Sequence, residues 1–225
     1  MVAMDQKVYS EKLAEIKQLT LEMGHKTVNA VELAAQALLE NNVEFAAQAR
    51  SLEKEVDDLY KRIDERCIAF FATQQPLGRD LRFLVSTIKI APEIERIADY
   101  ANNIAKKVQK KFSLEDMTSV KSLKPSIDVM AREVSSMLTE AMHCYEAGDA
   151  ELAVIVHQRN SLVNRLNKEL FQKIVGMTAQ NQNVNELAMD FHTTVRYIER
   201  VADRSCNIVE SVYYAVTGYR FEAKR

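Results

Sequence analysis

The chain has 225 residues, of which 47% are hydrophobic and 28% charged, and its formal net charge is −2 with a pI near 6.1. This balance is typical of a soluble folded protein with one large or two small domains, and it argues against a nucleic-acid binder. Only 5 glycines and 3 prolines are present, so turns are few and the elements between them are long. The abundance of Ala, Leu, Glu, Lys and Gln favours helices over strands.

Apolar residues that recur at three- and four-residue steps predict six long helices separated by short polar breaks. In chain order, the expected helices cover residues 6–40, 43–73, 79–112, 125–147, 150–177 and 184–217. No apolar run approaches the length of about 18 residues that a membrane-spanning helix needs. We therefore expect the protein to be peripheral to a membrane at most.

Two segments of the chain are related by an internal repeat. The pentapeptide Glu-Arg-Ile-Ala-Asp at residues 95–99 reappears as Glu-Arg-Val-Ala-Asp at residues 199–203 (199 − 95 = 104). The turn at Asn41 and the turn at Gly148 have a similar offset (148 − 41 = 107). We therefore predict an all-α fold, a tandem duplication of an antiparallel three-helix bundle with pseudo-two-fold symmetry. The expected divisions are a first repeat at 1–113, a linker at 114–118, a second repeat at 119–219 and a tail at 220–225.

Each pentapeptide places a Glu and an Asp four residues apart, on one face of its helix. Asn103 and Asn207 continue these two acidic stripes. Like charges at this spacing destabilise an isolated helix by about 0.2–0.5 kcal/mol, so the repeated pattern needs an explanation. A bound cation facing each stripe is one explanation, and ion pairs from Arg96 and Arg200 to the aspartates are the other.

The repeated pentapeptide, the preceding Gln-Pro-Leu-Gly-Arg-Asp-Leu-Arg at residues 75–82, and the doubled three-helix layout resemble the PhoU family. The resemblance covers residues 4–219. It implies a cytoplasmic, non-enzymatic negative regulator of the phosphate-starvation response and of phosphate uptake. Such a regulator couples the phosphate ABC transporter to a sensor histidine kinase, and several family members are homodimers.

The resemblance also implies metal ions at Glu/Asp-x-x-x-Asp motifs, two in each repeat. In this chain the matching residues are Glu53, Asp57, Glu95 and Asp99 in the first repeat, and Glu199 and Asp203 in the second. The fourth motif departs from the pattern, because the positions equivalent to Glu53 and Asp57 are Asn160 and Asn164 (160 − 53 = 107). An amide can ligate through its oxygen but brings no charge, so we expect a weaker second site.

Carboxylate ligands suit Mg²⁺, Mn²⁺ or iron, and the sequence does not choose among them. Asn103 and Asn207 are further candidate ligands on the same helices. His157 and His192 lie at helical steps from the second-repeat motifs. If they contribute, the second site would favour Zn²⁺.

Two other interpretations remain open. A ferritin-like di-metal enzyme would use two Glu-x-x-His motifs, here Glu22 with His25 and Glu140 with His143. These motifs are not related by the repeat (140 − 22 = 118), so we rank the enzyme below the regulator. The third interpretation is a helical adaptor without metal. The 3 cysteines form no CxxC motif and fit free thiols in the cytoplasm.

Overall fold

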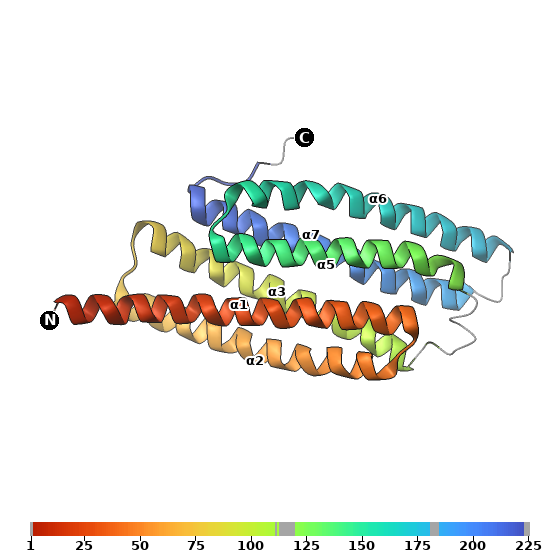
Figure 1. Ribbon diagram of the computed structural model, residues 1–225, viewed down its shortest axis with the longest axis horizontal. Helices are drawn as coiled ribbons and strands as arrows, with labels where there is room; N and C mark the ends of the chain where they lie inside the picture. Colours follow the sequence, from red (N-terminus) through yellow and green to blue (C-terminus); the bar gives the residue numbers. More distant parts are fainter. Residues whose placement is uncertain (1, 111, 113–119, 181–184, 223–225) are drawn as a thin grey trace.

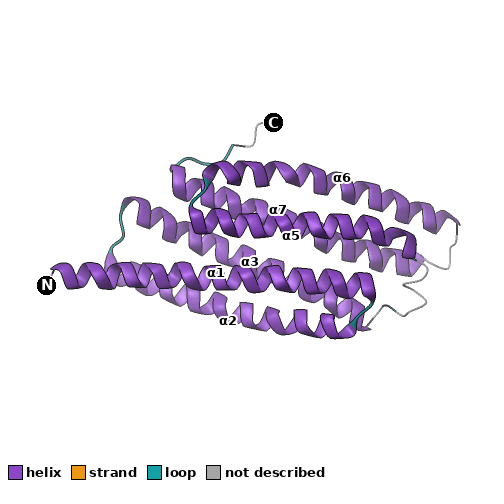
Figure 2. Cartoon of the chain, in the orientation of Figure 1, coloured by secondary structure: helices purple, strands orange, loops and turns teal. Residues whose placement is uncertain are grey.

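The computed structural model describes residues 2–110, 112, 120–180 and 185–222. Within these ranges the chain forms six long α-helices and one 3-10 turn, without any strand (Figure 2). The elements are α1 (Val2–Glu40), α2 (Val43–Gln74), α3 (Gly78–Lys110), η1 (Lys121–Leu123), α5 (Lys124–Ala147), α6 (Ala150–Gln180) and α7 (Asn185–Thr217). The predicted helices are confirmed to within a few residues at each end. The expected linker, 114–118, lies outside the described residues.

The second helix of each repeat begins in the same way. Oδ1 of Asn42 accepts hydrogen bonds from two backbone N–H groups of the first turn of α2, at 2.9 and 3.2 Å. Oδ1 of Asp149 does the same for α6, at 3.0 and 2.9 Å. Such caps satisfy N–H groups that have no partner within the helix. The two caps are separated by the offset found in the sequence (149 − 42 = 107). The internal repeat therefore extends to the detail of how the second helix of each repeat is capped.

Helices α1, α2 and α3 pack together as one antiparallel bundle, and α5, α6 and α7 form a second bundle beside it (Figure 1). The main contacts between the bundles are α3 against α7 and α1 against α5. Because each of these pairs joins equivalent helices, the two repeats are related by a pseudo-two-fold axis. None of the described helices combines the length and the apolar character needed to cross a bilayer.

The apolar stripe of α2 faces the interior. Its buried members are Val56, Leu59, Ile63, Cys67 and Phe70. Burial of each larger side chain of this kind contributes roughly 1.5–3 kcal/mol. The core continues between the bundles, where the Phe112 ring contacts the Phe191 ring at 5.3 Å between centroids. Since apolar packing crosses the seam, the two repeats form one core and hold their acidic faces in fixed places.

Candidate functional site

The four acidic residues predicted in the first repeat lie on neighbouring helices. α2 carries Glu53 and Asp57, one turn apart, and α3 carries Glu95 and Asp99 in the same arrangement. Partial burial raises the pKa of Glu95, and the charges of Asp99, Asp57 and Glu53 raise it further. Burial and the charge of Asp57 likewise raise the pKa of Asp99. The four carboxylates therefore repel one another across the two helices, and we call them the first acidic cluster.

Asn102 is a further member of this site that the sequence analysis missed. Its Nδ2 donates a hydrogen bond to Oε1 of Glu53 at 2.6 Å, and the residue is 5% exposed. Its Oδ1 is buried and accepts no hydrogen bond from the described residues. A buried oxygen without a donor is costly, so this one is available to a cation. The signal was its position three residues after Asp99, on the same helical face; Asn103, which was predicted, is half-buried nearby on α3.

The arginines of the two pentapeptides do not pair with the aspartates of those pentapeptides in the described structure. Nη1 of Arg96 lies 3.6 Å from Oε1 of Glu93, and the guanidinium of Arg200 lies over the ring of Tyr100, 5.8 Å from its centroid. Arg96 lowers the pKa of Glu95, but burial and the neighbouring carboxylates outweigh it. Ion pairs from Arg96 and Arg200 to these aspartates therefore do not explain the repeated acidic stripes.

Amide groups satisfy the equivalent carboxylates in the second repeat. Asn160 Nδ2 donates to Oδ1 of Asp203 at 3.0 Å, and Asn167 Nδ2 donates to Oε1 of Glu199 at 2.7 Å. The other oxygen of Glu199 is 2.6 Å from Nη1 of Arg196, an ion pair that lacks hydrogen-bond alignment. Glu199 is only 8% exposed. Its charge is therefore balanced from within the protein, unlike those of the first acidic cluster.

Two of the predicted amide ligands make no hydrogen bond to Glu199 or Asp203 among the described residues. Asn207 Nδ2 donates to Oε2 of Glu93 at 2.8 Å, and Arg204 Nη1 donates to the same oxygen at 3.1 Å. Because Glu93 is on α3 and the donors are on α7, Asn207 belongs to the contact between the repeats. Asn164 is exposed on α6.

The two histidines considered as ligands have other neighbours. Nε2 of His157 lies 3.0 Å from Oε1 of Glu210, and the ring of His192 packs against Phe171 with centroids 4.8 Å apart. Burial lowers the pKa of His192, against the opposing charge of Glu199. His157 therefore pairs with Glu210. Within the described ranges His192 makes no such pair with Glu199, but the charge of Glu199 acts on its pKa.

The donor atoms of the first acidic cluster are all oxygens, four carboxylates and the amide of Asn102. Such a set fits Mg²⁺, Mn²⁺ or iron better than a soft metal. As the side chains lie, no three His, Cys, Asp or Glu residues in the described ranges are close enough to share one ion. Binding of an ion here would therefore require the carboxylates to turn toward one another.

The Glu-x-x-His pairs of the di-metal interpretation do not meet inside a bundle. Glu22, His25 and His143 are exposed, whereas Glu140 accepts a hydrogen bond from Nη1 of Arg159 at 2.6 Å. Ligands of ferritin-like sites project into the bundle core from facing helices. This arrangement therefore gives the enzyme interpretation no support.

Comparison with known proteins connects this geometry to a family. A family profile described as "PhoU domain" matches residues 20–108 and 127–212, one match in each repeat. A curated relative from Zymomonas mobilis, "Phosphate-specific transport system accessory protein PhoU homolog", is 32% identical over 212 residues, which cover 94% of this chain and 88% of the relative. A relative of the same description from Synechocystis sp. is 29% identical, with coverage of 94% and 92%.

Two solved structures share the fold. The crystal structure of PhoU from Pseudomonas aeruginosa superposes with a TM-score of 0.85 at 26% identity, covering 94% of this chain and 100% of that one. The phosphate transport system regulatory protein PhoU from Streptococcus pneumoniae gives a TM-score of 0.82 at 21% identity, with coverage of 96% and 100%. With a domain match in each repeat and a relative that is 32% identical along most of its length, the chain belongs to the PhoU family.

Proposed function

We propose that this protein is a cytoplasmic, non-enzymatic accessory of a phosphate-specific transport system, and that it represses the phosphate-starvation response and phosphate uptake when phosphate is plentiful. The observation that carries the proposal is the pair of PhoU domain matches, which cover both three-helix repeats. The relatives named as accessory proteins of phosphate-specific transport support it. Its cytoplasmic location is supported by Cys67, Cys144 and Cys206, which are free thiols, as expected in a reducing compartment.

The test of this role is a deletion of the gene in its own host. In phosphate-rich medium, the deletion strain should express phosphate-starvation genes that the parent keeps silent, and it should take up more phosphate. A plasmid copy of the gene should restore repression. Unchanged expression in the deletion strain would contradict the proposed role.

The proposed mechanism is physical coupling of the phosphate ABC transporter to a sensor histidine kinase. The long helices offer extended surfaces on both repeats, which suits a protein that holds two partners at once. A tagged copy of the chain should co-purify with both partners from phosphate-rich cells after mild crosslinking. If only the transporter co-purifies, the protein is still an accessory of transport, but the proposed coupling to the kinase is contradicted.

A metal ion at the first acidic cluster is the second part of the proposal. Glu53, Asp57, Glu95 and Asp99, with Oδ1 of Asn102, would hold a hard divalent or iron-type ion whose charge offsets their repulsion. The raised pKa values of Glu95 and Asp99 support this, because burial first and the neighbouring carboxylates second disfavour the charged forms that a bound cation would stabilise. The second repeat would bind more weakly, since it has two carboxylates where the first has four, and Arg196 already pairs with one of them.

Elemental analysis of the purified protein tests this part separately from regulation. We expect about one equivalent or more of Mg, Mn, Fe or Zn after gel filtration in metal-free buffer. The rival is a helical adaptor without metal, which is favoured by the absence of three convergent ligands among the described residues. Protein that carries no metal, and whose melting temperature is unchanged by added Mn²⁺ or Mg²⁺, would select the adaptor.

We also propose a homodimer. Large apolar side chains on the outer face of α6 and α7 support it, since Phe171, Val175 and Met189 are 45%, 48% and 66% exposed. Exposed apolar surface of this kind is typical of association sites. Sedimentation equilibrium should give twice the mass of the chain, 25.6 kDa, and Met189→Lys with Phe171→Glu should shift it to the monomer. A monomer at micromolar concentration in the unmodified protein would contradict this part.

A further inference from the structure

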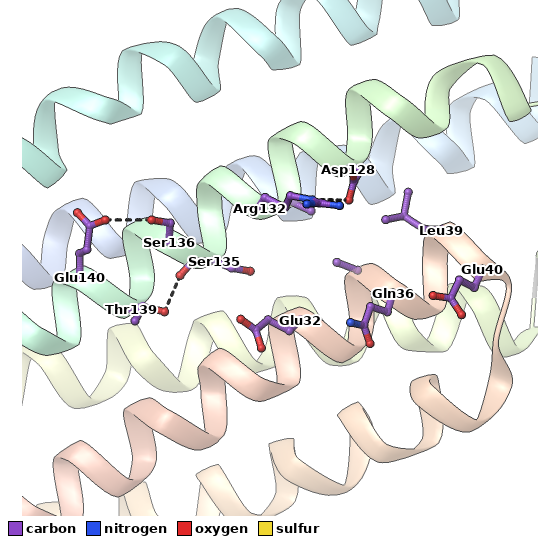
Figure 3. Close-up of a pocket in the computed structure, with 12 residues that line it drawn as sticks. Glu32, Gln36, Leu39, Glu40, Asp128, Arg132, Ser135, Ser136, Thr139 and Glu140 are labelled. Atoms are coloured by element: carbon purple, nitrogen blue, oxygen red, sulfur yellow. Dashed lines mark hydrogen bonds and ion pairs between the residues drawn. The ribbon is translucent and has the colours of Figure 1, made fainter.

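A groove of about 690 Å³ lies between α1 and α5, along the seam of the two repeats (Figure 3). Its α1 wall carries Glu32, Gln36 and Glu40, which project from the same face because they are four residues apart. Its α5 wall carries hydroxyl groups and charged residues, among them Ser135 and Glu140. The groove is far larger than a packing defect and falls in the size range of binding pockets.

The two walls differ in how their charges are balanced. On α5, Arg132 Nε donates to Asp128 at 3.0 Å, and Glu140 accepts from Arg159 at 2.6 Å. On α1, Glu32 and Glu40 are exposed and make no ion pair or hydrogen bond with the described residues. They are two helical turns apart, a distance of about 12 Å along the axis. The groove therefore presents two unbalanced negative charges at a fixed spacing.

Ser135 provides an independent sign of a ligand. The residue is 9% exposed, lines the groove and faces it in Figure 3. Its backbone carbonyl accepts a bond from Thr139 at 2.9 Å, but its Oγ has no partner among the described residues. This oxygen is accessible at the wall of the groove, so it can form a hydrogen bond with a polar group that enters.

The repeat explains why the groove is open. Ala35 and Ala131 line it, and their equivalents across the pseudo-two-fold axis are Met142 (142 − 35 = 107) and Gly24 (131 − 24 = 107). At that equivalent place the Met142 side chain fills the seam so tightly that a Cβ on Gly24 would lie 2.6 Å from its Sδ. The small side chain of Ala35 leaves unfilled the space that Met142 occupies in the other half of the seam.

We propose that this groove binds an α-helical segment of a partner protein that carries two lysines or arginines about two turns apart. The charges on α1 set this spacing, and a helix lying along the groove matches it, since residues seven or eight apart return to one face. The site is separate from the first acidic cluster, and its occupant is defined by chemistry alone. The proposal therefore stands whether or not the phosphate-regulatory role holds.

The test is fluorescence anisotropy with a labelled 18-residue helical peptide built from Ala and Gln, with two lysines eight residues apart. Full-length protein should bind it, and a peptide with glutamates in place of the lysines should not bind. Glu32→Gln with Glu40→Gln should weaken binding about tenfold, because it removes both complementary charges. The matched control is Asp64→Asn with Glu65→Gln, which makes the same charge change on the exposed face of α2 and should leave binding unchanged.

A second variant tests the shape of the groove without changing its charge. Ala35→Met should abolish binding of the lysine peptide, because the Cβ of Ala131 prevents the new side chain from packing as Met142 does against Gly24 and directs it into the groove. Circular dichroism melting confirms that each variant is folded. If Ala35→Met does not fold, the variant that combines Glu32→Gln with Glu40→Gln tests the proposal, because both residues are exposed. Equal losses in that variant and in the α2 control would indicate general charge attraction and overturn the proposal. Competition by spermine as effective as that of the peptide would assign the groove to a small polyamine instead.

Discussion

Lys17 and Lys124 make the same bond in opposite directions across the seam between the repeats. Nζ of Lys17 donates to the carbonyl oxygen of Glu146 at 2.7 Å, and Nζ of Lys124 donates to that of Leu39 at 2.6 Å. The donors are related by the repeat offset (124 − 17 = 107), and so are the acceptors (146 − 39 = 107). Each lysine thus supports the last turn of a helix in the other repeat, where carbonyls lack partners and positive charge is favoured.

Replacing these lysines should loosen the seam. We expect Lys17→Met and Lys124→Met each to lower the free energy of unfolding by about 1 kcal/mol. The loss should be larger for Lys124, because its bond is partly buried whereas that of Lys17 is exposed. Urea titration measures the change. The control is Lys54→Met, which replaces an exposed lysine of α2. If the seam variants are as stable as the control, the two bonds contribute nothing in solution.

Neutralising Asp99 should stabilise the metal-free protein at neutral pH. The pKa values of Glu95 and Asp99 are raised in the folded state, so this state holds protons more tightly than the unfolded chain. Stability must then fall as pH rises from the ordinary carboxyl pKa, about 4, through the raised values. In EDTA at pH 7, Asp99→Asn should gain about 0.5 kcal/mol, and the gain should shrink toward pH 4.

Melting curves from pH 4 to pH 8 measure this effect, with Asp58→Asn, an exposed residue of α2, as control. A gain that is constant across the pH range would mean that charge repulsion is not its cause. In saturating Mn²⁺ the sign should reverse, because the substitution then removes a ligand.

The two repeats should respond differently to loss of their carboxylates. Glu53→Gln with Asp57→Asn should reduce bound metal and remove most of the stabilisation by metal, which is about 2.7 kcal/mol at a hundredfold excess over the dissociation constant. Glu199→Gln with Asp203→Asn should remove less. Instead, it should destabilise the protein with or without metal, because Glu199 loses its ion pair with Arg196. Metal content and melting temperature of both variants test this, and equal losses of metal-dependent stability would contradict it.

Gly24 and Met142 should be energetically coupled. Alanine is favoured over glycine within a helix by about 1 kcal/mol, yet Gly24→Ala should destabilise the protein because its Cβ meets the Met142 side chain. Met142→Ala alone should cost about 2–5 kcal/mol through the cavity it leaves. In the double variant the new methyl group enters that cavity, so the loss should be at least 1 kcal/mol smaller than the sum of the single losses. Additive losses in urea titration would show that the two residues do not touch.

The helices and the first acidic cluster could be predicted because both depend on local spacing. Apolar periodicity and turn residues fix each helix, and a four-residue step fixes which carboxylates share a face. The spacing between Asp99 and Asn102 is equally local, so Asn102 could have been found. The pairing of Glu93 with Asn207 could not, because it depends on how α3 and α7 are rotated against each other. That rotation is set by packing of the whole seam.

The groove between α1 and α5 could be predicted from the sequence only in part. Its cause, Ala35 in the place equivalent to Met142, is visible once the sequence is aligned with itself at an offset of 107 (142 − 35 = 107). Its size is not visible, because the surrounding helices could have closed over the smaller side chain. The lysine bonds at the two ends of the seam join α1 to α5, so the position of the two helices is fixed by contacts outside the groove.

A duplicated fold normally offers each of its surfaces twice, and a partner could then occupy both copies at once. Here the tight packing of Met142 against Gly24 closes one half of the α1–α5 seam, whereas the other half stays open. We therefore expect one partner segment per chain at this seam. Because the two repeats differ there, the open half also lies at one fixed place relative to the first acidic cluster.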